Sequence, residues 1–536
     1  MSRRQIENDG IGGVSRRHFV RTSALLGGGL IATSGIARAA PAGAPSRGPY
    51  FDVRDFGAIG DGKTDDTRAL QRALDSARQA GGGIVQVPAG TWLSGGLQLH
   101  SRLTVDLAPG ATLLASPEGD DFPPYERGRG DSDVETTDFA HALLRGHDLD
   151  HVSIQGAGVI DMNRDSRFGP KPIALRRCHF VTIRDVTILR SPNYCVSLGG
   201  CDDVLVDGVT IRDAYADGID PDCCRRVRIS NCDVEADDDA LCLKTSFHLG
   251  ARHTTEEVTI TNCRLRSPSN CFKLGTESSG DFRQIVLSNC VLNGLPTEHH
   301  DDDAAEGGGI ALLTVDGGTI DGVVVANVVM HDVAAPLFLR LGNRGRDQAR
   351  RAPGKLRNVT ISGIVALGAS DTSSISGLPD HPIERVVVEN VRIATTGGSD
   401  EKHGLDVPER AAEYPEVSMY GDLPAFGLYV RHGSDVIVRN VELNVEHADV
   451  RPALVADDVT QLHLTGLGGG SVWLNDIQGG LVQGNLAPAG VYLRVTGENT
   501  KRVQLTGWTP EAVEVAPEIT PTAVIPVADT ALRRPS

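Results

Sequence analysis

The chain of 536 residues lacks an excess of basic residues, is poor in aromatic residues, and has no apolar run long enough to span a bilayer comfortably. Its formal net charge of −18 argues against nucleic acid as a partner, because binding to phosphates needs clustered Lys and Arg. An acidic polysaccharide stays compatible with this charge if the cleft is locally basic. Long periodic helices are also missing, which excludes a helical solenoid. Charged residues make up an ordinary 23%, which argues against wholesale disorder.

The N-terminus has the pattern of an export signal. Arg16 and Arg17 precede the short apolar run ALLGGGLIA, and Ala37-Arg38-Ala39 is a small-residue cleavage site. We interpret residues 1–39 as a twin-arginine signal peptide and residues 40–49 as a linker. The alternative, a chance Arg pair before a membrane anchor, is disfavoured because the run is short and interrupted by Gly. We therefore expect a periplasmic or extracellular protein that leaves the membrane after cleavage.

The cysteines predict neither a metal site nor a cofactor. Export would allow disulfides, but Cys232, Cys263 and Cys290 each directly follow an Asn at the same place in a repeat. This regularity predicts buried free thiols stacked in the interior. The adjacent pair Cys223 and Cys224 has no partner at a zinc-ligand spacing.

A β-branched triplet recurs along the chain from residue 152. Ten such triplets begin at Val152, Val181, Val204, Val227, Val258, Ile285, Val323, Val359, Val386 and Val436. Alternation sends the first and third residues of each triplet inward. Asn follows six of them, at 231, 262, 289, 327, 390 and 440, where it can adopt left-handed backbone geometry and pair with the next Asn. The pattern predicts a right-handed parallel β-helix over residues 50–515, followed by a flexible tail at 516–536.

A helix is expected ahead of the repeats. Asp65 and Asp66 precede a helical period through Leu70 and Leu74, with Thr64 as the predicted N-cap and a Gly run at the end. Such a helix would cover the open edge of the first coil.

Acidic residues recur at one phase of the repeat. Asp217 lies 13 residues past Val204, Asp238 and Asp239 lie 11 and 12 past Val227, and Asn270 lies 12 past Val258. Because neighbouring coils are about 4.8 Å apart, these side chains should stack on one face. The sequence therefore predicts a carboxylate cluster.

Clustered carboxylates suit the hydrolysis of a glycosidic bond. One protonated carboxyl must donate to the leaving oxygen, and in an inverting enzyme a second carboxylate, about 6.5–9.5 Å away, activates water. Crowding pushes the pKa values of neighbouring acids apart, so that one can stay protonated. Turn aspartates or a calcium site are the alternatives; two clusters in near-identical phase on adjacent coils favour a functional site.

Several motifs resemble known sugar-cleaving enzymes. GAIGDGKTDDTRALQRAL and GGGIVQVPAG resemble the N-terminal cap of pectin-degrading β-helix enzymes, while SPNYCVSLGGCDDV, DGIDPDCCRRVRISNC and DDALCLK resemble glycoside hydrolase family 28, the polygalacturonase and rhamnogalacturonase group. The resemblance covers roughly residues 50–370. It implies an inverting hydrolase in which Asp217 activates water, Asp238 donates the proton and Asp239 helps to hold the water.

The chain departs from this family at binding positions. Tyr215 stands where the family has Asn, Asn270 where it has His, and Ala311 and Leu313 where its Arg-x-Lys is expected. The cations that bind the substrate carboxylate are thus missing there, which favours a different sugar unit, such as a neutral one. The candidate substrate-binding residues are Asp220, Asn193, Asn270, Lys244, Lys273 and Arg340. Arg340 on the next coil could replace a lost cation, whereas Lys244 and Lys273 are also readable as solvated strand ends.

The resulting hypothesis is an exported, monomeric glycoside hydrolase whose partner is a pectic or related polysaccharide. Two alternatives stay open. One is a polysaccharide lyase on the same fold, whose chemistry usually needs an Arg or Lys base beside Ca²⁺-binding acids. The other is a catalytically degenerate carbohydrate-binding β-helix, which the lost binding residues favour and the intact aspartates oppose.

Overall fold

The computed structural model describes residues 49–124, 141–296, 307–484, 492–508, 512–520 and 522–526. The predicted signal peptide, and the linker up to residue 48, lie outside the described residues. Within the described residues no helix is long and apolar enough to cross a membrane.

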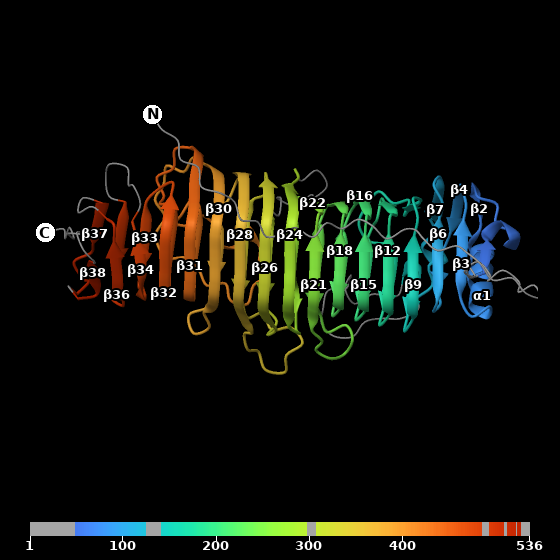
Figure 1. Cartoon of the computed structure of the whole chain (residues 1–536), viewed down its shortest axis with the longest axis horizontal. Coiled ribbons are helices and arrows are strands. Elements are labelled where there is room, and N and C mark those ends of the chain that lie inside the picture. The colour runs from blue at the N-terminus through green and yellow to red at the C-terminus, as the bar shows by residue number, and fades with distance from the viewer. Residues whose placement is uncertain are drawn as a thin grey trace, which may run out of the picture. The chain divides into compact units, whose positions relative to one another are not determined.

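The described chain folds into a right-handed parallel β-helix, which confirms the predicted fold class. Its strands pair in parallel between coils and form three ladders that run side by side (Figure 1). A short helix, α1 (Thr67–Gln79), lies at the N-terminal end of the stack. The three-residue and four-residue 3₁₀ turns are η1 (Val53–Phe56), η2 (Gly119–Asp121) and η3 (Val417–Tyr420).

The first ladder contains β1 (Tyr50–Asp52), β3 (Gly83–Val87), β6 (Leu103–Leu107), β9 (Asp150–Gln155), β12 (His179–Arg184), β15 (Asp202–Asp207), β18 (Arg225–Ser230), β21 (Thr255–Thr261), β24 (Phe282–Gly294), β26 (Thr319–His331), β28 (Lys355–Ala369), β30 (Ile383–Gly397), β31 (Leu428–His447), β32 (Leu454–Gly468), β34 (Gln478–Gln483), β36 (Lys501–Thr506) and β38 (Val524–Pro526). The second ladder contains β2 (Asp61–Asp65), β4 (Gly90–Ser94), β7 (Ala111–Ala115), β10 (Val159–Asp161), β13 (Thr187–Leu189), β16 (Thr210–Ala214), β19 (Asp233–Ala236) and β22 (Arg264–Ser267), and continues in the later halves of the long strands from β24 onward.

The third ladder contains β5 (Leu97–Gln98), β8 (Ala142–His147), β11 (Lys171–Arg176), β14 (Val196–Gly199), β17 (Ile219–Asp222), β20 (Leu241–Thr245), β23 (Phe272–Ser278), β25 (Gly308–Thr314), β27 (Ala335–Leu341), β29 (Ser373–Ser376), β33 (Val472–Asn475), β35 (Leu493–Thr496) and β37 (Val513–Val515). The first residues of β31 and β32 also belong to it.

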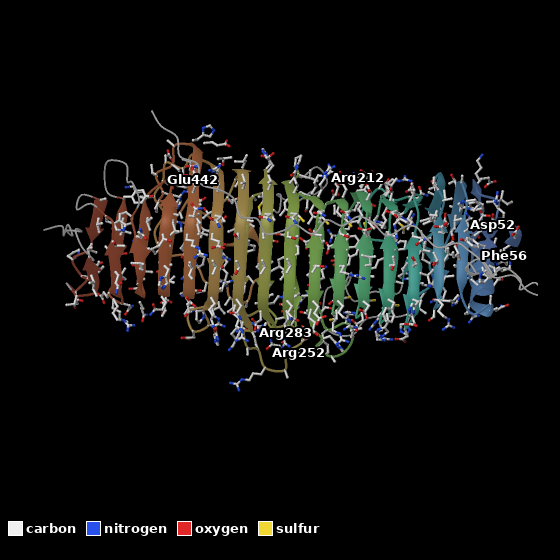
Figure 2. All side chains as sticks on the ribbon, in the orientation of Figure 1. Asp52, Phe56, Arg212, Arg252, Arg283 and Glu442 are labelled. Carbon is white, nitrogen blue, oxygen red and sulfur yellow. The ribbon has the colours of Figure 1, made fainter. Side chains whose placement is uncertain are left out.

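The repeated triplets set the register of the first ladder. Val204 lies opposite Val227, which lies opposite Val258, so each triplet stacks on the next and its first and third residues enter the core. The six Asn residues after the triplets all have φ between 51° and 57°, and Asn440 donates to Asn390 at 2.7 Å. The predicted left-handed geometry is confirmed for all six, whereas Asn–Asn pairing is found for Asn440 with Asn390 and Asn327 with Asn289, and Asn231 donates to Asp207 instead. Charged side chains such as Arg283 and Glu442 stand outward from the strands (Figure 2).

All ten cysteines are buried and free, which confirms the prediction made for Cys232, Cys263 and Cys290. Cys232, Cys263 and Cys290 extend the core directly after the Asn positions. The thiols therefore act as small apolar side chains of the interior.

Helix α1 covers the first coils through Ala69, Leu70, Ala73, Leu74 and Ala77. The predicted N-cap was wrong: Asp66 holds that position and Thr64 lies in β2. The Asp66 carboxylate instead accepts hydrogen bonds from the amides of Ile59 and Gly60 at 2.7 and 2.9 Å. A buried carboxylate thus fixes the loop before the helix, which local sequence rules do not reveal.

The β-helix extends beyond residue 515, its predicted last residue. β38 pairs with β36, so part of the predicted flexible tail is a strand of the first ladder. Residues 527–536 lie outside the described part of the chain.

Residues 405–425, which we name the covering segment, lie over the outer face of the third ladder. Val407, Tyr420 and Leu423 from this segment form one apolar cluster with a set of outward-facing residues of the ladder. That set is Ala311, Leu313, Phe338, Tyr429 and Val455. The outer face is therefore apolar and covered over these coils.

Candidate active site

The candidate site is built from one turn that recurs in successive coils, between the second and third ladders. We name it the site turn. The site turns from β10 to β23 carry Arg167, then Asn193 and Tyr194, then Asp217, then Asp238 and Asp239, then Asn270. The structure thus brings together the residues that the sequence placed in one phase, because parallel pairing stacks each turn on the next.

Asp217, Asp238 and Asp239 form the acid cluster. Each offers a carboxylate oxygen, and these atoms all lie within 4.8 Å of one another. The side chains of Asp217 and Asp239 are only 2% exposed, whereas that of Asp238 is 26% exposed. Asp238 is therefore the member that a large ligand can reach most easily.

Each acid of the cluster has a cationic partner. Arg167 Nη2 lies 2.7 Å from Asp238 Oδ2, Lys273 Nζ lies 2.7 Å from Asp239 Oδ2, and Lys244 Nζ lies 2.6 Å from Asp217 Oδ2. Burial alone would lower the pKa values of the two lysines, but the charges of the neighbouring aspartates raise both well above the usual value. The two lysines are buried, charged members of the site and not solvated strand ends.

Asp220 adds a fourth carboxylate next to Asp217. Its Oδ1 lies 3.2 Å from Lys244 Nζ, yet neither of its oxygens accepts a hydrogen bond of good geometry from a described residue. Burial raises the pKa of Asp220 to about 6. Burial, reinforced by the charge of Asp220, raises the pKa of Asp217 well above its usual value. Crowding of like charges favours the protonated form, so the pair Asp217 and Asp220 binds a proton more readily than an isolated aspartate does.

Asp238 is in the opposite state. Burial alone would raise the pKa of Asp238, but the positive charges of Arg167 and Lys273 outweigh it and hold this pKa below the usual value. The charges around the site therefore favour ionisation of Asp238 and protonation within the buried pair Asp217 and Asp220.

Two predicted binding residues instead position others. The Asn270 amide donates to Asp239 Oδ1 at 2.8 Å and its oxygen accepts from the Gly308 amide at 2.9 Å. Asn193 donates to the Gly169 carbonyl at 3.1 Å and accepts from the Tyr194 amide at 2.8 Å. Both amides are therefore occupied by the protein, one orienting an acid and the other anchoring the loop that carries Arg167.

The structure does not bring Arg340 into the cluster. Arg340 is 1% exposed and donates to Ser376 Oγ and to the carbonyls of Gly377 and Glu409. Its guanidinium thus ties the covering segment to the third ladder. Ala311 and Leu313, where family cations were expected, lie under the same segment.

Sequence reasoning missed four neighbours of the cluster. Arg167 and Phe168 come from a longer site turn, so counting from the triplet does not find them; Phe168 is 77% exposed. The Tyr194 ring lies 3.9 Å from Lys244 Nζ, and Tyr414 of the covering segment lies 5.7 Å from Lys273 Nζ. Tyr194 stood within a quoted motif, whereas Tyr414 lies 141 residues away from Lys273 in sequence and gave no local signal.

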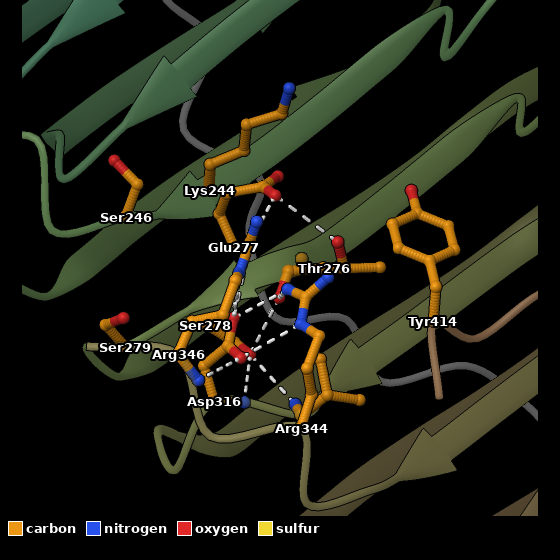
Figure 3. A network of polar contacts seen from close by, with 12 residues as sticks. Lys244, Ser246, Thr276, Glu277, Ser278, Ser279, Asp316, Arg344, Arg346 and Tyr414 are labelled. Carbon is orange, nitrogen blue, oxygen red and sulfur yellow. Dashed lines mark hydrogen bonds and ion pairs between the residues drawn. The ribbon is translucent and has the colours of Figure 1, made fainter. Parts of the chain in front are cut away.

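A second polar network adjoins the cluster on the β23 side (Figure 3). Arg346 lies 2.6 Å from Glu277, and Arg344 lies 2.6 Å from Asp316. Burial opposes ionisation of Glu277, but the charges of Lys244 and Arg346 lower its pKa. These arginines pair with Glu277 and Asp316, whereas Arg167, Lys244 and Lys273 pair with the acid cluster itself.

The fold and the carboxylate cluster define a β-helix protein with a clustered acid site, and comparison with known proteins gives its family. The family model "Glycosyl hydrolases family 28" matches residues 86–412, so the chain belongs to that family and is a glycoside hydrolase. A further model, "Rhamnogalacturonase A/epimerase, pectate lyase-like", matches residues 50–105.

One curated relative agrees with this family, and a solved structure shares the fold. A probable polygalacturonase of Vitis vinifera is 28% identical over 63% of this chain and 73% of its own length. An exopolygalacturonase of Thermotoga maritima shares the fold, with a TM-score of 0.58 and 20% identity over 73% of this chain and 91% of that one. Alginate lyase 7 of Azotobacter vinelandii is 60% identical, but over only 9% of this chain and 6% of its own length.

Asp220→Asn should flatten the pH dependence of stability between about pH 4 and pH 6. The folded pKa of Asp220 is about 6 and the unfolded value is about 3.9. A raised pKa favours folding while the carboxyl is protonated, so this stabilisation is full below about pH 4 and is lost as pH rises toward 6. Urea unfolding should show the wild type losing on the order of 2 kcal/mol more than Asp220→Asn across this window. Parallel curves for the two proteins would contradict the assigned pKa.

Proposed function

We propose that this chain is an exported inverting hydrolase that cleaves a pectic polysaccharide containing uronic acid units, with Asp217, Asp238 and Asp239 as the catalytic residues. The observation that carries the proposal is the difference in depth between the three acids. Asp238 is exposed enough to contact the glycosidic oxygen, while Asp217 and Asp239 are buried below it.

The proposed reaction has one step at the sugar. The Asp238 carboxyl gives its proton to the glycosidic oxygen as the bond from that oxygen to the anomeric carbon breaks. A water held by Asp217 and Asp239 attacks the anomeric carbon from the opposite face and gives its proton to Asp217. Water is consumed and both carboxyl groups exchange protonation states, so the step balances.

The burial of Asp217 and Asp239 also favours inversion over a mechanism with a covalent intermediate. The oxygens of the cluster lie within 4.8 Å, which is closer than the 6.5–9.5 Å typical between carboxyl groups of inverting enzymes and nearer to the 5–5.5 Å typical of retaining ones. A retaining nucleophile, however, must touch the anomeric carbon. Asp217 and Asp239, at 2% exposure, are too deep for a sugar ring to reach, but a water molecule can lie between them and the sugar.

Arg167 connects substrate binding to the proton donor. A substrate carboxylate competes with Asp238 for the guanidinium, which binds carboxylates in a bidentate manner. Once Arg167 turns to the substrate, Asp238 loses the charge that keeps it ionised. The proton of the Asp217 and Asp220 pair then passes to Asp238, which leaves Asp217 ionised as the base. The acid and base roles are thus assigned only when a uronate unit is bound.

The cations of the site determine the proposed substrate. The expectation of a neutral sugar unit depended on the missing family cations at 311 and 313, but Arg167, which is 26% exposed, supplies positive charge from another position. We therefore propose a galacturonate-containing polymer, in line with the relatives named polygalacturonase. The exposed ring of Phe168, next to Arg167, can pack against a sugar face.

The lyase alternative fits this site less well. Lyase chemistry needs a neutral base, but Lys244 and Lys273 have pKa values raised well above the usual value by the acids beside them and stay protonated. It also needs acids available to Ca²⁺, whereas each of Asp217, Asp238 and Asp239 is already paired with a cation. Hydrolysis uses this charge arrangement and elimination does not.

Asp238→Asn should lower turnover on polygalacturonate by at least about 100-fold, because general acid catalysis contributes about 10²–10⁴-fold. Release of reducing ends measures the loss, and the absence of new near-ultraviolet absorption in the wild-type reaction separates hydrolysis from elimination. Asp237→Asn, at the preceding position of the same turn and outside the acid cluster, is the control and should retain most activity. Near-full activity of Asp238→Asn would reject the assigned donor.

Arg167→Met should separate binding from chemistry. The Michaelis constant for polygalacturonate should rise by at least tenfold, because a substrate carboxylate loses its partner. The pKa of Asp238 should rise in this variant, because Asp238 loses the charge of Arg167 and keeps only Lys273 and Lys244, beside the acids Asp217 and Asp239. The fall of kcat/KM with rising pH should therefore move to higher pH. Arg212→Met removes an Arg–Asp pair of similar exposure elsewhere and should change neither quantity. An unmoved pH profile in Arg167→Met would refute the coupling.

Export stays a proposal based on residues 1–39. Replacing Arg16 and Arg17 by Lys should leave the precursor in the cytoplasm if the twin-arginine route is used. Fractionation followed by immunoblotting checks this, and unchanged export of the variant would show that another route operates.

A further inference from the structure

A pocket away from the acid cluster has the chemistry of a second sugar-binding site. It has a volume of about 380 Å³, within the range usual for ligand pockets. It lies against β33 and β35 of the third ladder and is bordered by two loop segments, residues 402–404 and 450–452. The catalytic proposal uses none of these residues.

The pocket is basic in an otherwise acidic protein. Lys402, His403, Arg451 and Arg494 line it, and no Asp or Glu is among its described lining residues. Arg451 is neutralised by Asp449 at 2.7 Å. Lys402 and Arg494 form no ion pair with another described residue, which leaves their charges available. The whole chain has a net charge of −18, so this pocket is a local region of the opposite, positive sign, which suits an anionic ligand.

The wall of the pocket contains a fixed aromatic ring. Trp473 Nε1 donates to Thr496 Oγ1 at 2.8 Å, which holds the indole in place. The Arg494 guanidinium lies over this ring, 4.9 Å from its centroid, so a cation–π contact holds the positive charge at the indole. A hexuronate unit presents the matching features, an apolar ring face and a carboxylate.

The pocket lies on the same face as the acid cluster. In the register of the third ladder, Trp473 stands in line with Lys273, six strand spacings away, which is roughly 29 Å at about 4.8 Å per spacing. Between them, Ala311, Phe338 and Tyr429 lie in the apolar cluster that the covering segment closes. The pocket is therefore a separate site that a long polymer could reach at the same time.

We propose that this pocket binds a carboxylated sugar unit and acts as a non-catalytic anchor for an anionic polysaccharide. Trp473 packs against the ring face, while Arg494 and Lys402 pair with the carboxylate. Bound at both places, one polymer chain gains affinity by avidity, because the second contact becomes intramolecular. The choice of galacturonan as probe rests on the proposed function; binding to the pocket does not require hydrolysis.

The test measures binding in the Asp238→Asn protein, which leaves the probes intact. Calorimetry with tetragalacturonate should show two sites per chain, and adding Arg494→Glu should leave one. The affinity for polygalacturonate should fall at least tenfold in the Arg494→Glu protein. Neutral galactan should not bind the pocket. Arg502→Glu, an exposed arginine on β36 with the same change of charge, is the matched control and should behave as the parent.

Thermal unfolding verifies that Arg494→Glu folds, and Lys402→Glu, on an exposed loop, gives a second variant that does not alter the ladder. The proposal would be overturned if the parent showed only one binding site for tetragalacturonate. It would also be overturned if both pocket variants kept the parent's affinity for polygalacturonate, or if Arg502→Glu weakened that affinity as much as Arg494→Glu does. Failure of the proposed function looks different. In that case wild-type protein leaves polygalacturonate uncleaved, while tetragalacturonate still binds in a way that depends on Arg494.

Discussion

Parallel pairing of one coil on the next, in constant register along the first ladder from β12 to β24, is the constraint on which the site depends. Because Val204, Val227 and Val258 lie opposite one another, the turn that follows each coil recurs at one strand spacing. This stacking brings carboxylates 22 residues apart in sequence, those of Asp217 and Asp239, into one cluster. A register shift of one residue in this ladder would send its core residues outward and separate the acids. Core packing and the geometry of the acid cluster thus have the same origin.

Burying several acids together is costly, and the structure compensates for this cost with cations from neighbouring coils. Lys244 comes from the strand after the Asp238 turn, and Lys273 comes from the strand one coil later. Arg167 comes from the turn two coils before that of Asp217. The cations do not fully offset the burial of Asp217 and Asp220, whose pKa values stay raised. A cluster whose members have such different pKa values is suited to acid and base chemistry, because a small change in charge at its edge alters which carboxyl holds a proton.

The sequence predicted the fold and the acids because both depend on periodicity. The triplets, the Asn positions and the phase of Asp217, Asp238 and Asp239 can be counted along the chain. Residues outside this count were not predicted, because Arg167 lies in a longer turn and Tyr414 comes from an inserted segment. The sequence also does not show burial, so Lys244 and Lys273 were interpreted as solvated strand ends. For the same reason Arg340 was proposed as a binding residue, although its N–H groups donate to Ser376 and to Glu409 of the covering segment. Ala311 and Leu313 are apolar because that segment packs on them, a tertiary contact that no local pattern encodes.

The central claim is that two buried acids direct water to one face of a sugar while an exposed acid protonates the other side. The anomeric configuration of the first product tests this claim most directly. Proton NMR spectra recorded during the first minutes of polygalacturonate cleavage distinguish the two anomers before they interconvert. Our account predicts that the first-formed product has the configuration opposite to that of the bond cleaved. A product that keeps the original configuration would contradict the account, since it would require one of the buried acids to bond to the sugar itself.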